Sequence, residues 1–415
     1  MTDSAIPTLQ GRHHVLDRFE LALVGLVVFL SPMNYLRVDS FYLTFGDVAG
    51  FMAFFLILAT GRLPLRPLGP ATPVWLASFL LMISGLLIGS FVNGDPVAGT
   101  TIALQYSYSL ILLPVLICAR PYAQIVLLAK IFVLSITVIM IFGIFWLEFG
   151  DLTNWRLVSP SGRLRSLIER ENGAATMCGL AVTFLVWLTL TGRWSRLTGA
   201  VLAVPIVYGL LLTGSNTGLA VATVGVGSVI FFSGSFVLFS IGLVLVSLIA
   251  ATTYFWGDLF LPDVFQRRVF AAIQQGDLNQ AGTFSDRWFL IREAMDIANS
   301  HVLIGLGADQ HRLISAHGAP VHNTYLLMLT EGGLLSLVGL VGLLASGLYL
   351  GWLSLRQGGY MRGVMTLTII LLYMLLLNAF AHFYARFWII PLALALGISA
   401  SVFFDRSPHL ERRMR

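Results

Sequence analysis

The chain has 415 residues, of which 57% are hydrophobic and only 11% are charged, well below the share of about 25% that soluble domains carry. This composition excludes an ordinary soluble domain and predicts an integral membrane protein. The net charge of +5 does not indicate nucleic-acid binding, because the basic residues are scattered between apolar runs and form no single stripe.

The apolar runs predict the membrane helices. A span needs about 20 apolar residues, and about twelve segments approach that length. They lie near residues 20–35, 44–60, 73–92, 99–118, 124–147, 172–190, 197–213, 216–232, 235–255, 333–354, 363–380 and 387–404. We therefore expect an all-α polytopic membrane protein, with residues 1–415 forming one membrane domain and the first span retained.

Arginine placement predicts the orientation. Short cytoplasmic loops hold an excess of Lys and Arg, and that rule holds here if the N- and C-termini are both cytoplasmic. Two long connections, residues 148–171 and 256–332, then lie on the opposite face and carry arginines against the bias. We expect them to form an extracytoplasmic cap whose arginines bind an anionic ligand such as a phosphate. Contact with lipid headgroups is the alternative.

In the longer loop, residues 286–300 read as a short amphipathic helix at the membrane interface. Its buried side is expected to carry Trp288, Ile291, Met295 and Ala298. Arg287 falls on the buried flank, whereas Arg292 lies at the edge of the polar arc. A buried arginine must be paired or must bind an anion, so both a structural ion pair and a ligand-binding role are open for Arg287.

A second helix is expected to begin at His322, directly after Val321 and Pro320. A helix N-terminus favours the neutral imidazole, which can accept a proton as a general base. A simple capping role is the alternative. Glu331 lies nine residues on, roughly 13 Å along the axis, so we expect no His322–Glu331 dyad.

In the shorter loop, Arg163 and Arg165 are two residues apart, so an extended backbone aims both side chains to the same side. Such a pair could clamp a diphosphate. Glu171 and Asn172 then open the next span, where capping of the helix is the simplest explanation.

The remaining polar residues predict no metal and no cofactor. His311, His317 and His322 with Asp309 could be read as a metal cluster, but their spacing matches no helix-borne ligand pair. The stretch 305–307 is Gly-Leu-Gly, which lacks the other features of a dinucleotide site and is read as a turn.

Taken in order, several motifs resemble the O-antigen ligase and polymerase superfamily over most of residues 160–345. They are Ser161-Gly162-Arg163-Leu164-Arg165, Leu212-Thr213-Gly214-Ser215-Asn216-Thr217-Gly218, Arg287-Trp288, Gly305-Leu306-Gly307 and His322-Asn323 through Gly333. The most specific is His322-Asn323 followed by nine residues and Gly333. Two positions depart from the family pattern: Ser336 stands where glycine, threonine or tyrosine is more common, and Asn216 where many relatives carry arginine.

The resemblance implies a multi-span glycosyltransferase of the GT-C type in the bacterial inner membrane, with its active site facing the periplasm. The implied donor is a glycan on undecaprenyl diphosphate, and the reaction is a metal-independent, inverting transfer. Arg163, Arg165 and Arg287 are implied to hold the diphosphate, and His322 to activate the acceptor hydroxyl. Secondary candidates are Asn323, Tyr325, Glu331 and Arg292.

The acceptor distinguishes two members of this superfamily. Lipid A core as acceptor would make the protein an O-antigen ligase, which we favour because the histidine spacing fits. A second lipid-linked glycan as acceptor would make it an O-antigen or exopolysaccharide polymerase. A transporter or flippase of lipid-linked sugar is a more distant alternative, which duplicated halves and broken midplane helices would indicate. Apart from these glycans, membrane lipids are the expected partners.

Overall fold

The computed structural model describes residues 9–38, 43–270 and 284–405, and these residues are mostly helical. Within that part of the chain the only sheet is a two-stranded antiparallel hairpin that pairs Arg37 with Thr44 and Val38 with Leu43. The expected all-α polytopic membrane protein is confirmed at this level. Residues 271–283 of the expected longer loop lie outside the described residues.

The elements follow the apolar runs closely. The first half of the chain contains α1 (Leu9–Leu30), β1 (Arg37–Val38), β2 (Leu43–Thr44), α2 (Phe45–Ala59), α3 (Thr72–Val92), α4 (Pro96–Ser107), a π-helical turn (Tyr108–Leu112), α5 (Leu113–Ile117), α6 (Tyr122–Phe149) and α7 (Glu171–Leu190). Short 3-10 turns cover Gly69–Ala71 and Ser166–Ile168. The second half contains α8 (Arg196–Leu212), α9 (Asn216–Phe231), α10 (Phe236–Phe260), α11 (Asp263–Phe265), a π-helical turn (Gln266–Phe270), α14 (Phe284–His301), α15 (His311–Ile314), α16 (Thr324–Arg356), α17 (Tyr360–Leu376) and α18 (Arg386–Asp405).

Seven stretches of helix among the described residues are long and apolar enough to cross a membrane. They are Gly69–Val92, Pro96–Ile117, Tyr122–Phe149, Glu171–Leu190, Phe236–Gly257, Thr324–Arg356 and Arg386–Asp405. The helices α2, α8, α9 and α17 are apolar but shorter. The count of twelve spans therefore stays a prediction, although each predicted segment falls on a helix.

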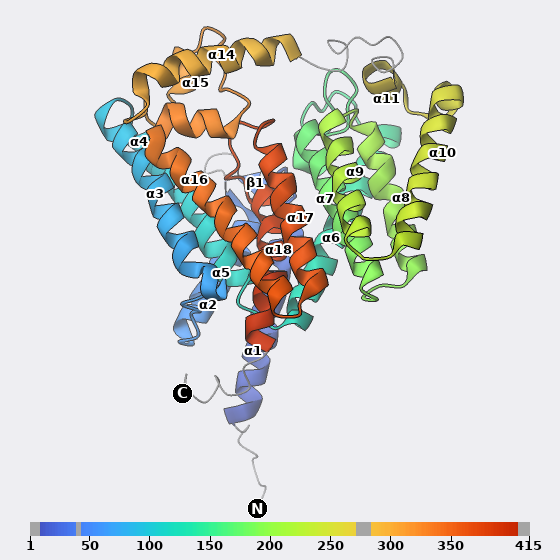
Figure 1. Ribbon diagram of the computed structural model, residues 1–415, viewed down its shortest axis with the longest axis horizontal. Helices are drawn as coiled ribbons and strands as arrows, with labels where there is room; N and C mark the ends of the chain where they lie inside the picture. The colour runs from blue at the N-terminus through green and yellow to red at the C-terminus, as the bar shows by residue number, and fades with distance from the viewer. Residues whose placement is uncertain (1–8, 39–42, 271–283, 406–415) are drawn as a thin grey trace, which may run out of the picture.

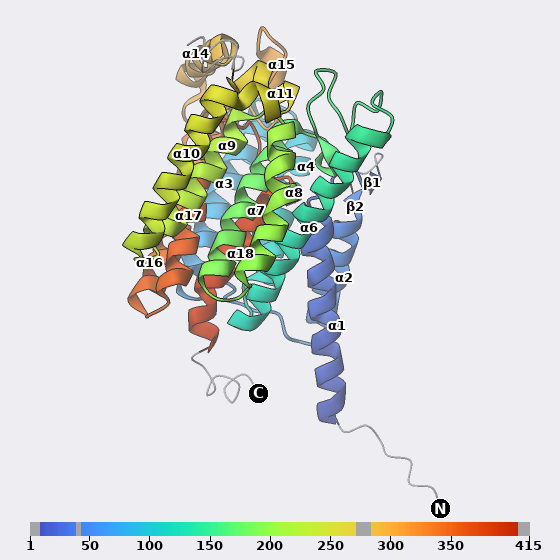
Figure 2. The same ribbon diagram turned by 90° about the vertical axis from the view of Figure 1, so that its right-hand side faces the viewer.

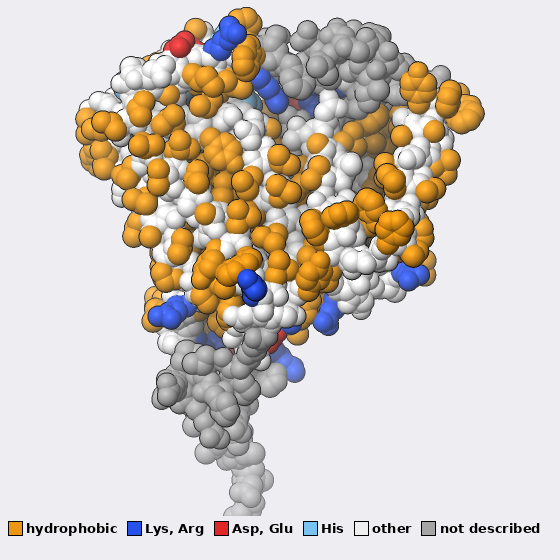
Figure 3. Space-filling view, viewed as in Figure 1, with side chains coloured by type: hydrophobic (Ala, Val, Ile, Leu, Met, Phe, Trp, Pro, Cys, Tyr) orange, Lys and Arg blue, Asp and Glu red, His pale blue; other side chains and the backbone are white. Residues whose placement is uncertain are grey.

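The helices run side by side, and the polar connections gather at one end (Figures 1 and 2). α3 packs along α16, and α7 packs against α8 and α9 on the other side of the molecule. α14, α15 and α11 lie at the upper end, whereas α1 begins and α18 ends at the lower end (Figure 1). Hydrophobic side chains cover the middle of the surface, and Lys and Arg gather toward its two ends (Figure 3). This distribution is the one that a bilayer-spanning protein requires.

Glycines bring the backbones of α3 and α16 into direct contact. A Cβ atom at Gly85 would lie 2.5 Å from the carbonyl oxygen of Gly332, and one at Gly339 would lie 2.3 Å from the backbone nitrogen of Met82. Small residues of this kind allow membrane helices to pack at short range. Ser336 stands in the same seam and donates a hydrogen bond to the carbonyl of Met82 (2.6 Å).

α16 is broken at Gly333, where φ is 67° and ψ is −170°. Such a conformation is open to glycine and strained for residues with a Cβ atom. The freed backbone groups are satisfied by the segment 302–308, since Leu334 N–H donates to the carbonyl of Val302 (2.7 Å) and Gly307 N–H to that of Glu331 (2.8 Å). The Gly-Leu-Gly turn predicted from the sequence therefore belongs to the segment that supplies the hydrogen-bond partners at the break. The first part of α16 runs in a different direction from the rest (Figure 1).

Candidate active site

α14 lies across the upper end of the molecule and packs against α16 (Figure 1). Its buried face carries Leu290, Ala294 and Ala298. Of these, Leu290 and Ala294 cluster with Val321 and Leu327. The sequence prediction was wrong for two residues of this face, because Trp288 is 53% exposed and Met295 is 48% exposed. The small alanines face the protein and allow close packing, and the larger side chains face outward, as Trp commonly does at a membrane interface.

Arg287 is half-buried beside this face. Burial lowers the pKa of its guanidinium, and no charged partner offsets that effect. Within residues 9–38, 43–270 and 284–405, no hydrogen bond or ion pair to Arg287 is found. The sequence left two roles open for Arg287, a structural ion pair and anion binding. The described residues contain no ion-pair partner, so Arg287 remains able to bind an anion.

His322 lies two residues before the start of α16, within reach of the positive charge of Arg287. The helix begins two residues later than predicted, at Thr324, with Asn323 as its N-cap. Three effects lower the pKa of the His322 imidazole: desolvation, the positive charge of Arg287 and that of Arg170. A hydrogen bond to the carbonyl of Pro320 opposes them in part. The neutral imidazole is favoured, so one ring nitrogen can accept a proton.

Arg170 was not singled out from the sequence, yet it brings the shorter loop to this site. It is exposed, and its charge acts on both His322 and Tyr384. Its position next to Glu171, at the end of an arginine-bearing loop, is the only sequence signal that pointed to it.

Two of the secondary candidates are occupied in holding α16. The Oδ1 of Asn323 accepts a hydrogen bond from the backbone N–H of Leu326 (3.0 Å), as an N-cap does. The hydroxyl of Tyr325 donates to the carbonyl of Met374 in α17 (3.0 Å). Both side chains therefore orient the segment that carries His322.

The other two secondary candidates lie apart from His322. Arg292 is exposed and lies over the ring of Trp288, at 5.2 Å from its centroid. Glu331 is only 1% exposed and lies against the backbone of Asp309 and His311, below the site. Glu331 is therefore buried whereas His322 is exposed, and the absence of a dyad between the two stays a prediction.

A buried polar cluster that the sequence did not predict surrounds Glu331. His382 and Tyr384, from the connection between α17 and α18, approach the loop that carries Asp309. Burial lowers the pKa of His382 to about 4, with a smaller opposing effect from the carboxylate of Asp309. Tyr106 of α4 packs edge to face on Tyr384, with ring centroids 5.3 Å apart.

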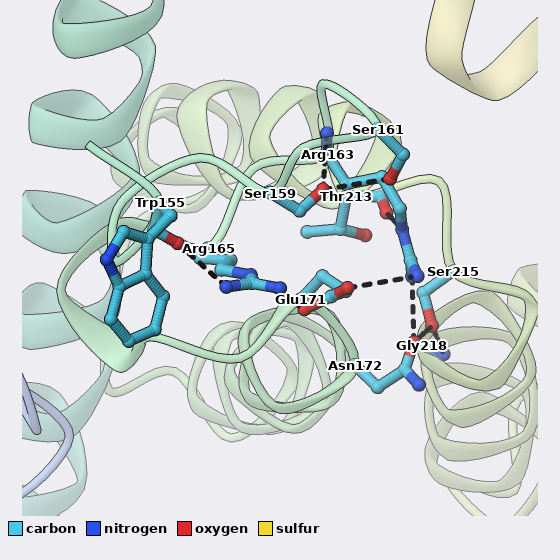
Figure 4. A network of polar contacts seen from close by, with 10 residues as sticks. All are labelled: Trp155, Ser159, Ser161, Arg163, Arg165, Glu171, Asn172, Thr213, Ser215 and Gly218. Carbon is cyan, nitrogen blue, oxygen red and sulfur yellow. Dashed lines mark hydrogen bonds and ion pairs between the residues drawn. The ribbon is translucent and has the colours of Figure 1, made fainter. Parts of the chain in front are cut away.

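Arg163 is buried and held on several sides by protein groups (Figure 4). Its Nε donates to the carbonyl of Thr213 (2.7 Å), and its Nη2 donates to the Oδ1 of Asn172 (2.8 Å). Its Nη1 lies 3.4 Å from the Oε1 of Glu171. These contacts fasten the shorter loop to the start of α7 and to the turn between α8 and α9.

Arg165 meets the same carboxylate. Its Nε donates to the Oε2 of Glu171 (3.0 Å), and its Nη1 donates to the carbonyl of Trp155 (2.7 Å). The two arginines therefore converge as their spacing predicted. The prediction that Glu171 and Asn172 act as simple caps was wrong, because their side chains are the arginines' partners, and Asn172 also accepts from the hydroxyl of Ser215 (3.0 Å).

Among the residues that the structure describes, no group of three or more His, Cys, Asp or Glu side chains is placed to hold a metal ion. His311 is fully buried, whereas His317 and His322 are exposed. The residues of the alternative metal cluster thus have different surroundings.

The fold and this polar end define a polytopic membrane protein with a candidate anion site outside its apolar band. Residues 200–341 match the family model of O-antigen ligase, so this region is similar to the O-antigen ligase and polymerase superfamily that the motifs resemble. The match includes Arg287, His322 and the glycine break at Gly333 and indicates a membrane glycosyltransferase; Arg163 and Arg165 precede it. No curated protein matches the chain.

Proposed function

We propose that the protein transfers a glycan from undecaprenyl diphosphate to a sugar hydroxyl on the periplasmic side of the bacterial inner membrane. The favoured acceptor is lipid A core, which makes the protein an O-antigen ligase. One observation carries the proposal: Arg287, which has no partner among the described residues, acts on His322. The pKa of the His322 imidazole is lowered, so its neutral form is favoured. One group can hold the leaving diphosphate, and the other can take the proton of the acceptor.

The reaction is a single displacement at the anomeric carbon. The acceptor oxygen forms the new glycosidic bond while its proton passes to a nitrogen of His322. The bond between the anomeric carbon and the diphosphate oxygen breaks, and the electron pair leaves with undecaprenyl diphosphate. Arg287 stabilises the negative charge that develops on this leaving group. Attack opposite to the leaving group inverts the anomeric configuration.

Arg163 and Arg165 are proposed as secondary contributors to donor binding. Each is already paired with Glu171, so only part of their charge remains for a ligand. Their network nevertheless holds the shorter loop in the position from which Arg170 acts on His322. Asn323 and Tyr325 act indirectly, because they orient the start of α16.

The test is reconstitution of the purified protein in nanodiscs with a glycan linked to undecaprenyl diphosphate. Lipid A core and a second lipid-linked glycan are offered as acceptors in separate reactions. Transfer to lipid A core supports the ligase, and growth of the lipid-linked chain supports the polymerase. Movement of the donor across the bilayer without transfer would favour the transporter and contradict both enzymatic functions.

The matched variants are Arg287→Ala and Arg292→Ala, two arginines of the same helix. Arg292 is exposed and rests on Trp288, so its loss should leave transfer near the wild-type rate. Loss of Arg287 should remove most of the transfer while the protein remains inserted in the membrane. Equal rates for the two variants would contradict the role given to Arg287.

A further inference from the structure

A third arginine lies over the Arg163 network, on a segment that follows α10. Gly214, in the turn between α8 and α9, has φ of +53° and allows this segment to approach closely. A Cβ atom there would lie 2.9 Å from the Cγ1 of Val264 and 3.5 Å from the Cδ of Arg268. The stem of Arg268 therefore packs on the same turn whose Thr213 carbonyl accepts from Arg163.

The charges at this point do not balance. Burial lowers the pKa of Arg163 to about 10, and the next largest cause is the positive charge of Arg268, ahead of the opposing effect of Glu171. Arg165 adds another positive charge. Arg163 and Arg165 thus share one carboxylate, and Arg268 adds a third positive charge beside Arg163, an arrangement that an anion would stabilise.

The three arginines differ in how many of their donors are occupied. Arg163 uses its Nε, Nη1 and Nη2 on protein groups, and Arg165 uses its Nε and Nη1. Arg268 is only half-buried, and its Nε is buried without a hydrogen-bond partner. A buried N–H group without a partner is costly, so the described protein groups leave the guanidinium of Arg268 incompletely satisfied.

We propose that Arg268 binds a phosphate oxygen of the donor diphosphate directly. Arg163 and Arg165 position the loop and add positive charge near the ligand. This inference rests on the proposed function for its ligand. It assigns the donor contact near α9 to one particular arginine of the longer loop, which none of the motifs includes. The start of α9, capped by Ser215, adds the positive end of a helix dipole on the same side.

The test compares Arg268→Ala with Arg267→Ala in the full-length protein. Arg267 is adjacent and exposed, so both variants lose the same charge from the same segment. The probes are undecaprenyl diphosphate in nanodiscs of neutral lipid and inorganic pyrophosphate added to the aqueous phase. We expect Arg268→Ala to weaken binding of both probes about tenfold or more, the loss typical of a charge-assisted hydrogen bond. Arg267→Ala should stay within about twofold of the wild type.

Arg268→Lys and anionic nanodiscs complete the design. Lysine keeps the charge but lacks the planar fork, so it should restore only part of the affinity. If the ligand is a lipid headgroup phosphate instead of a diphosphate, phosphatidylglycerol in the nanodisc will abolish binding of both probes to the wild type. That outcome, or full rescue by lysine, would overturn the assignment.

The inference and the proposed function fail in different ways. Normal glycan transfer with an unchanged donor KM in Arg268→Ala would overturn the role of Arg268 and leave the function standing. If pyrophosphate binding depends on Arg268 but the protein transfers no glycan, the role of Arg268 stands and the proposed function fails. Wild-type protein that binds neither probe would contradict both.

Discussion

The imidazole of His322 lies close enough to the guanidinium of Arg287 for the arginine's charge to lower the histidine's pKa. The two side chains come from different elements, because Arg287 belongs to α14 and His322 precedes α16. Packing of Leu290 and Ala294 against Val321 and Leu327 holds those elements together. The relationship matters for catalysis, since one cation can both bind a diphosphate and keep the base unprotonated.

Replacement of His322 by alanine should reduce glycan transfer by about 100-fold or more, the range that general-base catalysis contributes. The donor should still bind, because the arginines are untouched. Initial rates of transfer and donor affinity in nanodiscs check the two effects separately. His317→Ala, an exposed histidine of the same connection, is the control and should change neither. A His322→Ala protein that transfers glycan at the wild-type rate would show that another group takes the proton.

The pH profile should reveal the charge of Arg170. Desolvation and Arg287 lower the pKa of His322 most, and Arg170 lowers it further. Removal of that charge in Arg170→Gln makes protonation easier, so the pKa rises and the acidic limb of kcat/KM moves to higher pH. High salt should move the wild-type limb in the same direction, because Arg170 is exposed and its field is screened. An acidic limb that is identical in both proteins would argue against His322 as the base.

Loss of Glu171 should destabilise the protein more than loss of an exposed ion pair. The carboxylate holds Arg163 and Arg165, whose side chains are 7% and 18% exposed. Glu171→Gln leaves two partly buried arginines without their counter-charge, at a cost of about 1 to 3 kcal/mol. Arg312→Ala breaks an exposed pair with Asp309 and should cost about 0 to 1 kcal/mol. Thermal unfolding in detergent measures both, and equal shifts in Tm would contradict the structural role of Glu171.

The break in α16 depends on Gly333. Alanine there would place a Cβ atom 2.5 Å from the carbonyl oxygen of Leu303 and would be held at a positive φ, a conformation that costs about 1 kcal/mol or more. We expect Gly333→Ala to lower Tm and to lose transfer, because the part of the helix that follows His322 moves. Gly227→Ala in α9 is the control, since nothing lies within 4 Å of its Cβ position. An unchanged rate in Gly333→Ala would show that the break does not position the histidine.

His382 should make the protein less stable in acid. Burial lowers its pKa to about 4 in the folded protein, against an ordinary value of about 6.5. As the pH falls, the histidine is therefore protonated in the unfolded chain before it is protonated in the folded protein. The free energy of unfolding decreases as the pH falls from about 6.5 toward 4. The fall in Tm over this window should be smaller in His382→Asn, whatever its Tm at neutral pH. The same slope in the variant and the wild type would assign the acid sensitivity to other groups.

The sequence was sufficient for the helices but not for the side of each helix that is buried. Apolar runs mark spans because the bilayer demands them, and each predicted segment falls on a helix. In α14 the rule that apolar residues face inward failed, because at a membrane interface the outward face is apolar as well. Trp288 and Met295 are exposed for that reason.

The site could be predicted in part. Arg287 and His322 were recognisable because charge and imidazole are rare beside membrane spans. Arg170 and Arg268 belong to the loop arginines expected to bind an anion, but the sequence did not distinguish them from the others, since only tertiary contacts bring them to His322 and Arg163. The pairing of Glu171 with two arginines could not be read from the sequence, because Glu169 lies nearer to Arg165 along the chain and pairs instead with Arg37 and Arg156.

The glycine seam between α3 and α16 has a mechanical consequence. Where backbones touch with no side chains between them, rotation or sliding of one helix against the other meets immediate steric resistance. α3 and α16 should therefore move as one body that carries His322 at a fixed height. The same resistance holds α9 against α7, because a Cβ atom at Gly179 would lie 2.9 Å from the backbone nitrogen of Ala222. Among the described helices, α10 packs mainly against α9, so we expect a rearrangement that admits a bulky lipid-linked substrate to displace α10. The helices that carry His322 and the turn beside Arg163 would then stay in place while α10 moves.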